Sequence, residues 1–252
     1  MRAPPPVQQA DSDSFMIGLA AHQRPVQLIV AIPARNEADD IAACLRSVAL
    51  AASECDAYVE VVVAADSCCD GTLDVVRATP MNGVGLSIIE GDWASAGSAR
   101  AKAAALGLSQ AGSPSQLIWI ANTDADCEVP ADWCRRHIDL AQRCDAVSGI
   151  VDLDPERTAP SVYQAFLDTY HLDLDSHPHV HGANFGLRGD AYLAVGGWAM
   201  GIKVGEDHLL WNSLQAAGYR LRQDPALTVR TSARTRSRVF GGFATGLALL
   251  ER

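Results

Sequence analysis

The stretch VQLIVAIPARNEADDIAACLRSVALAA, residues 26–52, contains the pattern that decides the fold. Its apolar start, from about Val26 to Ile32, predicts a buried strand. Apolar residues then recur at helical spacing at Ile41, Leu45, Val48 and Ala52. Asn36 is a candidate helix cap, and the acidic residues that follow it suit the positive end of a helix dipole. The stretch therefore predicts a strand, a loop and a helix, in that order.

The same unit recurs along the first 150 residues. A near-continuous valine run opens residues 57–78, and further strand and helix patterns occupy residues 84–112 and 116–144. Residues 145–151, DAVSGIV, predict a fifth strand. Strands that alternate with helices imply right-handed crossovers, so we expect an α/β fold with a mostly parallel sheet and helices on both faces.

Polar side chains follow three of the predicted strands. They are Pro33, Arg35, Asn36 and Glu37 after the first, Asp66, Ser67 and Asp70 after the second, and Asn122, Asp124 and Asp126 after the fourth. In open parallel sheets, ligands bind outside the carboxyl ends of the strands. The sequence thus predicts a binding site at this edge.

Asp124 and Asp126 are the clearest hint of its chemistry. In an extended segment, residues two apart share a face, and unit charges about 4 Å apart repel by roughly 1 to 4 kcal/mol in water or near a protein surface. A divalent cation would relieve that repulsion, and oxygen ligands favour Mg²⁺ or Mn²⁺. The alternative is that both residues are turn or cap groups ahead of a helix that begins near Pro130.

Composition limits the class of protein. A chain of 252 residues with 48% hydrophobic residues can bury one large core, and its formal net charge of −10 argues against nucleic-acid binding. The seven cysteines lack disulfide or zinc spacing, which fits reduced thiols in the cytoplasm. No apolar run is long enough for a spanning helix, so any membrane contact is expected to be peripheral. We expect a disordered tail over residues 1–23 and a single domain over residues 24–252.

The second half of that domain departs from the strand and helix rhythm. We divide the domain into a nucleotide-binding half, residues 24–150, and an acceptor-side half, residues 151–252. In the latter we expect a helix with Leu209, Leu210 and Leu214 toward the core and Gly218 as its stop. A basic island near the end is expected to be a surface or to meet a phosphate; it comprises Arg230, Arg234, Arg236 and Arg238.

Several motifs, taken in order, resemble family 2 glycosyltransferases of the GT-A fold. They are VAIPARNEADDIAACLRSV, EVVVAADSCCDGT, GSARAKAAALG, NTDADCEVPADW, HGANFGLRGDAYLAVGGW and GEDHLLWNSLQAAGYRL. Each motif alone is weak, but the ordered set spans most of residues 26–222 and is fairly specific. The resemblance implies a GT-A sheet, a nucleotide-sugar donor (a UDP-sugar is favoured) and an Mg²⁺ or Mn²⁺ ion.

The resemblance also implies roles for individual residues. Pro33, Arg35 and Glu37 would line the nucleotide pocket. Asp66 would contact the base, although Ala65 stands where many members carry a second aspartate. Arg100 would lie near the diphosphate.

The acidic motifs complete the implied site. Asp124 and Asp126 would be the DxD pair, with Asp124 also near the ribose. In the GED motif, Asp207 would be the general base and Glu206 would contact substrate. His208 would be a third metal ligand, as a downstream histidine is in some related enzymes.

Two features around residue 180 each allow a functional and a purely structural interpretation. His177, His179 and His181 alternate like metal ligands, but a histidine-rich loop is more often a solvent or substrate contact. The segment that contains Gly182 and Asn184 either brings backbone and Asn184 to the donor sugar or forms a simple bend.

Other functions stay open at this point. A retaining transferase would need no base at Asp207, and a non-catalytic homologue would bind the sugar nucleotide without turnover. A sugar-nucleotide-forming nucleotidyltransferase would need a glycine-rich basic loop where AIPARNEADD is acidic. Neither a GxGxxG dinucleotide turn nor a Walker lysine loop is present.

Overall fold

The computed structural model describes residues 23–156, 158–170 and 177–231. The predicted N-terminal tail lies outside these residues except for residue 23, and so do three arginines of the basic island, Arg234, Arg236 and Arg238.

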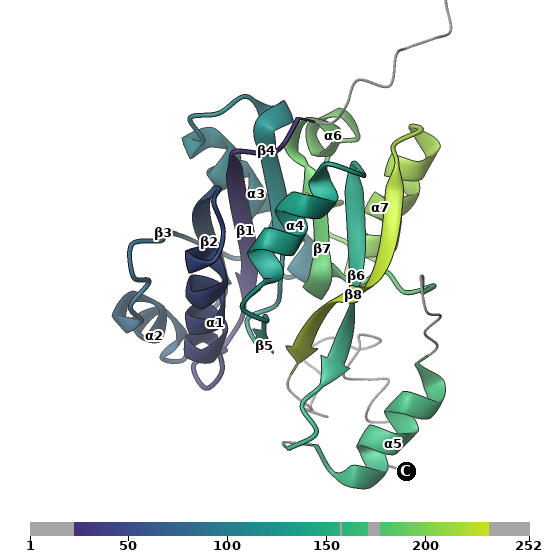
Figure 1. The fold of residues 1–252 in the computed structure, drawn as a ribbon. Helices are drawn as coiled ribbons and strands as arrows, with labels where there is room; N and C mark the ends of the chain where they lie inside the picture. The colour runs from purple at the N-terminus through teal and green to yellow at the C-terminus, as the bar shows by residue number, and fades with distance from the viewer. Residues whose placement is uncertain (1–22, 157, 171–176, 232–252) are drawn as a thin grey trace, which may run out of the picture.

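The described chain forms one eight-stranded sheet with helices on both faces (Figure 1). The strands are β1 (Gln27–Ala34), β2 (Tyr58–Asp66), β3 (Gly85–Gly91), β4 (Ile118–Asn122), β5 (Cys127–Glu128), β6 (Ala146–Leu153), β7 (Phe185–Arg188) and β8 (Leu221–Thr231). The helices are α1 (Ile41–Ser53), α2 (Thr72–Ala78), α3 (Ala96–Gln110), α4 (Trp133–Ala141), α5 (Pro160–Thr169), α6 (Gly189–Ala194) and α7 (Glu206–Ala216), with short 3-10 turns η1 (Ser115–Leu117) and η2 (Gly182–Asn184).

The sheet order is β3-β2-β1-β4-β7-β6-β8-β5. The first four strands in this order run parallel, as the repeated units predicted, and β6 is parallel to β8. Strand β7 runs antiparallel to both β4 and β6, and β5 is antiparallel to β8. The carboxyl ends of β1, β2, β3 and β4 therefore meet at one edge.

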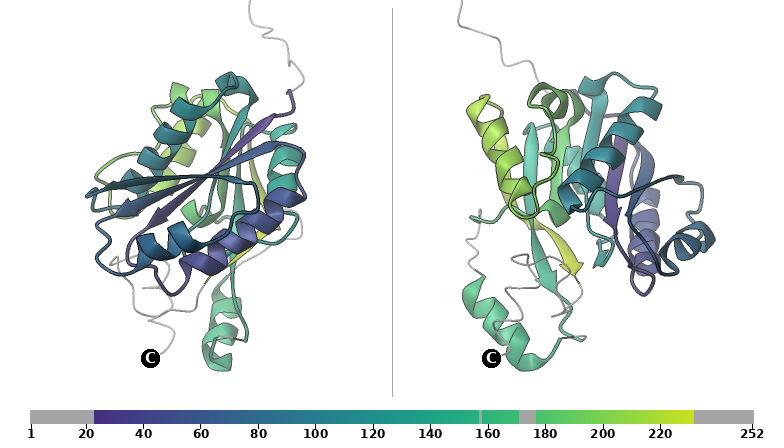
Figure 2. Two further views of the ribbon diagram at one scale, coloured as in Figure 1. Left: turned by 90° about the vertical axis from the view of Figure 1, so that its left-hand side faces the viewer. Right: turned by 180° about the vertical axis from the view of Figure 1, so that it is seen from behind.

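Alternate residues of the central strands pack into two cores. Leu28, Val30 and Ile32 of β1 face a core that includes α1, α2 and α4. Ile29 and Ala31 face the opposite core, to which α3, α6 and α7 contribute. Helix α5 projects away from this body, and its Phe166 packs with Leu153 of β6 (Figure 2). Both sheet faces are covered, which explains why β1 and β2 are apolar without alternation.

Three local expectations were wrong. Asn36 does not cap α1, which begins at Ile41 after Asp40; Asn36 instead has a φ of 56° in the loop. Leu209 is 46% exposed, because only Leu210 and Leu214 lie on the buried side of α7. The third expectation was an extended segment at Asp124 and Asp126, which instead lie in the turn between β4 and β5. Gly218, with a φ of 79°, follows α7 as predicted.

Within the described ranges, no helix has the length and apolar character needed to cross a membrane.

Candidate active site

The loops after β1 and β2 are joined by side-chain hydrogen bonds. The backbone N–H of Cys69 donates to Asn36 Oδ1 at 2.8 Å. The N–H of Glu37 donates to the hydroxyl of buried Thr72 at 2.7 Å, and the N–H of Thr72 donates to Asp70 Oδ1 at 3.0 Å. Because the bonds to Asn36 and from Glu37 cross between neighbouring loops, they fix the backbone that carries Glu37.

A left-handed residue that is not glycine occurs in the loop after each of the first three strands. These residues are Asn36 (φ 56°), Ser67 (φ 53°) and Ala94 (φ 55°). Such conformations cost roughly 1 to 3 kcal/mol each and persist only where the surrounding structure holds them. Strained backbone gathers at functional sites, so this edge of the sheet is the best candidate for one.

Asp66 lies buried at the end of β2. Its Oδ1 accepts hydrogen bonds from the backbone N–H groups of Trp93 and Ala94, at 2.7 and 3.1 Å. Its Oδ2 lies 3.9 Å from a guanidinium nitrogen of Arg35, whose side chain is half exposed. The carboxylate therefore joins the loops after β2 and β3, while Oδ2 faces the arginine that sequence analysis placed in the nucleotide pocket.

Arg100, in α3, is the central charged group of the site. Its side chain is only 4% exposed, and its guanidinium contacts Asp124 Oδ1 at 2.5 Å and Glu206 Oε1 at 2.8 Å. Burial alone would lower the pKa of Arg100, but the charges of Asp124 and Glu206 outweigh it and raise the pKa. The guanidinium carbon also lies 5.4 Å from the ring centre of Trp198. The arginine thus holds together the DxD turn, α3 and the start of α7.

Asp124 and Asp126 lie in a turn rather than in the expected extended segment. The N–H of Cys127 donates to the carbonyl oxygen of Asp124 at 3.0 Å, which closes the turn between β4 and β5. Asp124 faces Arg100, whereas Asp126 lines a pocket of about 440 Å³ with Glu128 and other residues. The extended premise failed because β4 ends at Asn122.

Asp207 lies beside the same cluster. Its Oδ2 accepts a hydrogen bond from the N–H of Gly182 at 3.1 Å, and its Oδ1 accepts one from the N–H of His208 at 2.8 Å. A Cβ atom at Gly182 would lie 2.7 Å from the guanidinium carbon of Arg100, so only glycine fits there. The backbone at Gly182 therefore approaches Arg100 closely, while its approach to a donor sugar stays a prediction.

Asn184 does not reach the site through its side chain. It is fully buried, and its Nδ2 donates to the carbonyl oxygens of Ile150 and Leu227, both at 2.8 Å. Its Oδ1 accepts a hydrogen bond from the indole of Trp133 at 3.0 Å. These bonds use its amide to join β6, β8 and α4, and substrate binding by Asn184 stays a prediction.

The alternating histidines form a stack of rings instead of a metal centre. Tyr170 and His179 are parallel at 4.0 Å, and His179 stacks on His177 and His181 at 5.8 and 5.6 Å. His177 Nδ1 accepts the N–H of His179, and its Nε2 contacts the carbonyl oxygen of Ser148. Burial, with the charge of His179, lowers the pKa of His181 to about 4.

The described residues contain no group of three or more histidine, cysteine, aspartate or glutamate side chains arranged to hold a metal ion. Asp124 and Asp126 nevertheless fit Mg²⁺ or Mn²⁺, since such ions are often bound by one or two carboxylates together with substrate phosphates. His208 is exposed, and the structure places its backbone next to Asp207 without giving its ring a metal-binding partner.

Sequence reasoning missed two parts of this site. The first is Thr72, which joins the first two loops together with Asp70, a residue already expected at this edge; the DGT run after β2 was a visible signal for that turn. The paired contacts of Arg100 with Asp124 and Glu206 had no local signal, because they join residues far apart in the chain. Pro33 and Glu37 lie at the edge as expected, both half-buried.

Comparisons with known proteins agree with this architecture. A family model described as glycosyl transferase family 2 matches residues 29–196. A search of curated protein sequences found no match.

Among solved structures, TarS 1-349 of S. aureus in complex with UDP-GlcNAc has a TM-score of 0.62 and 17% identity, over 86% of this chain and 61% of that one. A mannosyltransferase of Pyrobaculum calidifontis in complex with GDP-Man and Mn²⁺ has a TM-score of 0.56 and 22% identity, over 85% and 59%. This chain spans about 60% of the length of these structures. The likeness confirms the predicted GT-A fold.

Proposed function

The chain belongs to glycosyl transferase family 2, and we propose that it transfers a sugar from a nucleotide diphosphate donor to an acceptor hydroxyl with inversion at the anomeric carbon. The observation that carries the proposal is the buried contact of Arg100 with Asp124 and Glu206, with Asp207 held beside it. Acidic groups from β4 and α7 thereby gather at the edge where ligands of parallel sheets bind.

The nucleotide binds against the loops after β1 and β2. Pro33, Arg35 and Glu37 line the pocket, and Asp66 contacts the base, for which we favour uracil. The hydrogen bonds that the backbone N–H groups of Glu37 and Cys69 donate to Thr72 and Asn36 support this assignment, because they hold these loops in one conformation before the donor arrives. Preformed loops lower the entropic cost of binding.

Asp124 and Asp126 are the residues that would hold Mg²⁺ or Mn²⁺, with His208 as a candidate third ligand. The bound ion would supply positive charge to the diphosphate as the nucleotide leaves. The solved mannosyltransferase complex contains Mn²⁺, which supports a divalent ion here. Arg100 keeps Asp124 in place and adds a fixed positive charge beside the same edge.

Asp207 is the proposed general base. Two backbone N–H groups, those of Gly182 and His208, orient its carboxylate. Oriented in this way, it accepts the proton of the acceptor hydroxyl as that oxygen attacks the sugar. Glu206 would act on substrate mainly through Arg100, because its carboxylate is buried against that guanidinium. We place the reaction in the cytoplasm, with peripheral membrane contact at most.

The test is the variant Asp207→Asn, with turnover and donor binding measured separately. We expect turnover to fall about 10²- to 10⁴-fold while calorimetric affinity for UDP-sugars with Mn²⁺ is kept. The matched control is Asp74→Asn, whose side chain is exposed at the start of α2. Normal turnover in Asp207→Asn would contradict the base and favour a retaining transferase.

A second set of experiments tests the metal site and whether the protein catalyses any reaction of the donor. In Asp126→Ala we expect the metal-dependent part of donor binding to disappear, and equal titration heats with and without Mn²⁺ in the unaltered protein would contradict metal use. Slow release of free sugar from the donor in the absence of acceptor is expected. Donor binding without either hydrolysis or transfer would identify a non-catalytic homologue.

A further inference from the structure

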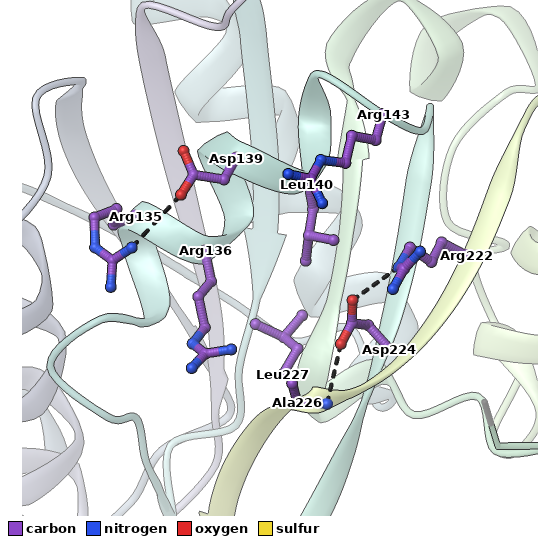
Figure 3. A pocket seen from close by; sticks show the side chains of 9 residues that line it. All are labelled: Arg135, Arg136, Asp139, Leu140, Arg143, Arg222, Asp224, Ala226 and Leu227. Carbon is purple, nitrogen blue, oxygen red and sulfur yellow. Dashed lines mark hydrogen bonds and ion pairs between the residues drawn. The ribbon is translucent and has the colours of Figure 1, made fainter. Parts of the chain in front are cut away.

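A second pocket lies between the end of α4 and β8, on the face of the sheet that α4 covers in part (Figure 3). Its volume is about 370 Å³. It is lined by Arg135, Arg136, Asp139, Leu140, Arg143, Arg222, Asp224, Ala226 and Leu227. None of these residues belongs to the candidate active site, so the pocket needs an explanation of its own.

The charge of this pocket is opposite to that of the chain. Four guanidinium groups and two carboxylates line it, in a protein whose formal net charge is −10. Figure 3 shows Arg143 extending from the end of α4 over Leu140, Arg222 of β8 pointing toward Asp224, and Arg136 pointing toward Leu227. An excess of like charges around one pocket gains nothing for stability, but it creates a favourable potential for an anion.

Nearby carboxylates pair with these arginines to different degrees. Arg135 lies 3.6 Å from Asp139, and Arg222 lies 2.8 Å from Asp224, while both arginine side chains remain nearly half exposed. The Arg135–Asp139 pair is exposed on both sides and contributes about 0 to 1 kcal/mol, so that guanidinium can turn to a new partner at little cost. Arg222 is held more firmly, because its partner Asp224 is buried, but nearly half of the arginine side chain still faces solvent.

Arg143 is the least engaged of the four. Its guanidinium has no hydrogen-bond or ion-pair partner among the residues that the structure describes, and its side chain is exposed. Arginine presents planar donors that match phosphate in a bidentate way. Arg143 and Arg222 therefore offer two such forks above an apolar floor formed by Leu140 and Leu227.

We propose that this pocket binds a phosphate-bearing small molecule, separately from the donor site. The supporting observations are the four arginines that line one pocket, the unengaged Arg143, and a volume within the range of small-molecule pockets. The inference does not depend on the transferase activity, because it uses no residue of the acidic edge.

The experiment titrates the full chain with inorganic pyrophosphate in buffer with EDTA, which removes the metal that the donor site would need. We expect saturable heat with a Kd of about 1 mM or tighter, weakened by added salt. In Arg143→Gln combined with Arg222→Gln, affinity should fall at least about tenfold, the equivalent of removing two charge-assisted contacts. The matched control is Arg77→Gln, which removes an exposed, ion-paired arginine elsewhere.

Each outcome decides the proposal. Loss of affinity in the double variant but not in Arg77→Gln supports the pocket. Unsaturable binding, or equal affinity in all three proteins, overturns it. Both altered arginines of the pocket are exposed, so circular dichroism should show an unchanged fold. A transferase that proves inactive with every donor would leave this result unaffected.

Discussion

The acidic edge and the basic pocket use arginine in opposite ways. At the edge, one guanidinium, that of Arg100, is 4% exposed and is fixed between two carboxylates. In the pocket, the side chains of Arg135, Arg136 and Arg222 are 40 to 49% exposed, and each pairs with an aspartate. Burial of the arginine makes the first arrangement rigid, whereas the exposed guanidiniums of the second can still reach a partner in solution. Similar contact distances therefore carry very different free energies.

The variant Arg100→Met is the most direct test of this comparison. The substitution keeps much of the side-chain volume but leaves Asp124 and Glu206 without their cation, so we expect the free energy of unfolding to fall by about 3 to 5 kcal/mol. Urea unfolding measures the change. Arg24→Met, which removes an exposed pair with Asp56, should cost less than about 1 kcal/mol. Equal losses in the two variants would show that burial does not separate them.

The pH dependence of stability extends this comparison. Arginines stay charged at every pH of interest, whereas His137 and His181 stay neutral in the folded chain until the pH is low. Burial lowers the pKa of His137 to about 3, and burial with His179 lowers that of His181 to about 4. Below about pH 6.5 the unfolded chain binds protons at these positions and the folded chain does not. Stability should therefore be complete above pH 6.5 and fall by about 1.4 kcal/mol per pH unit for each histidine as pH drops toward 4.

Thermal unfolding between pH 7.5 and 5 measures this slope. His181→Phe should remove its own share of the slope and leave the share of His137, whose Nδ1 accepts the indole N–H of Trp119 inside the core. A slope that is the same in the variant and in the unaltered chain would contradict the role given to His181.

The smallest effect is expected in the basic pocket. Arg135→Gln removes contacts with Asp132 and Asp139, which lie 3.5 and 3.6 Å away, one turn before and one turn after it along α4. The free energy of unfolding should change by less than about 0.5 kcal/mol, because such helical pairs are exposed and screened. Chemical denaturation with and without added salt tests this. A fall in the free energy of unfolding above about 1 kcal/mol would show that Arg135 contributes substantially to the stability of the fold.

The strands and their common edge were predictable because they depend on local apolar patterns. Residues 26–52 and 57–78 carry continuous apolar runs, and the polar residues after them lie where parallel strands end. The positions of Asp66 and Asp124 at that edge follow from the same patterns. Their roles in binding a donor stay predictions.

Other features depend on contacts that no short stretch of sequence specifies. Asn184 was expected at the substrate, but carbonyl groups of β6 and β8 and the indole of Trp133 draw its amide into the core. The antiparallel insertion of β7 between β4 and β6 likewise needs the whole sheet. Asn36 looked like a helix cap, yet a neighbouring loop binds its side chain.

The pairing of β5 has a consequence for the order in which the protein assembles. Residues Cys127 and Glu128 follow the turn of Asp124 and Asp126, and they pair with Thr231 and Arg230 at the end of β8. During synthesis, β5, which follows that turn directly, has no strand to pair with until β8 leaves the ribosome. Long-range pairing of this kind forms late. A nascent chain that already contains β1 to β4 is therefore expected to gain its completed acidic edge only after β8 has been made and has paired with β5.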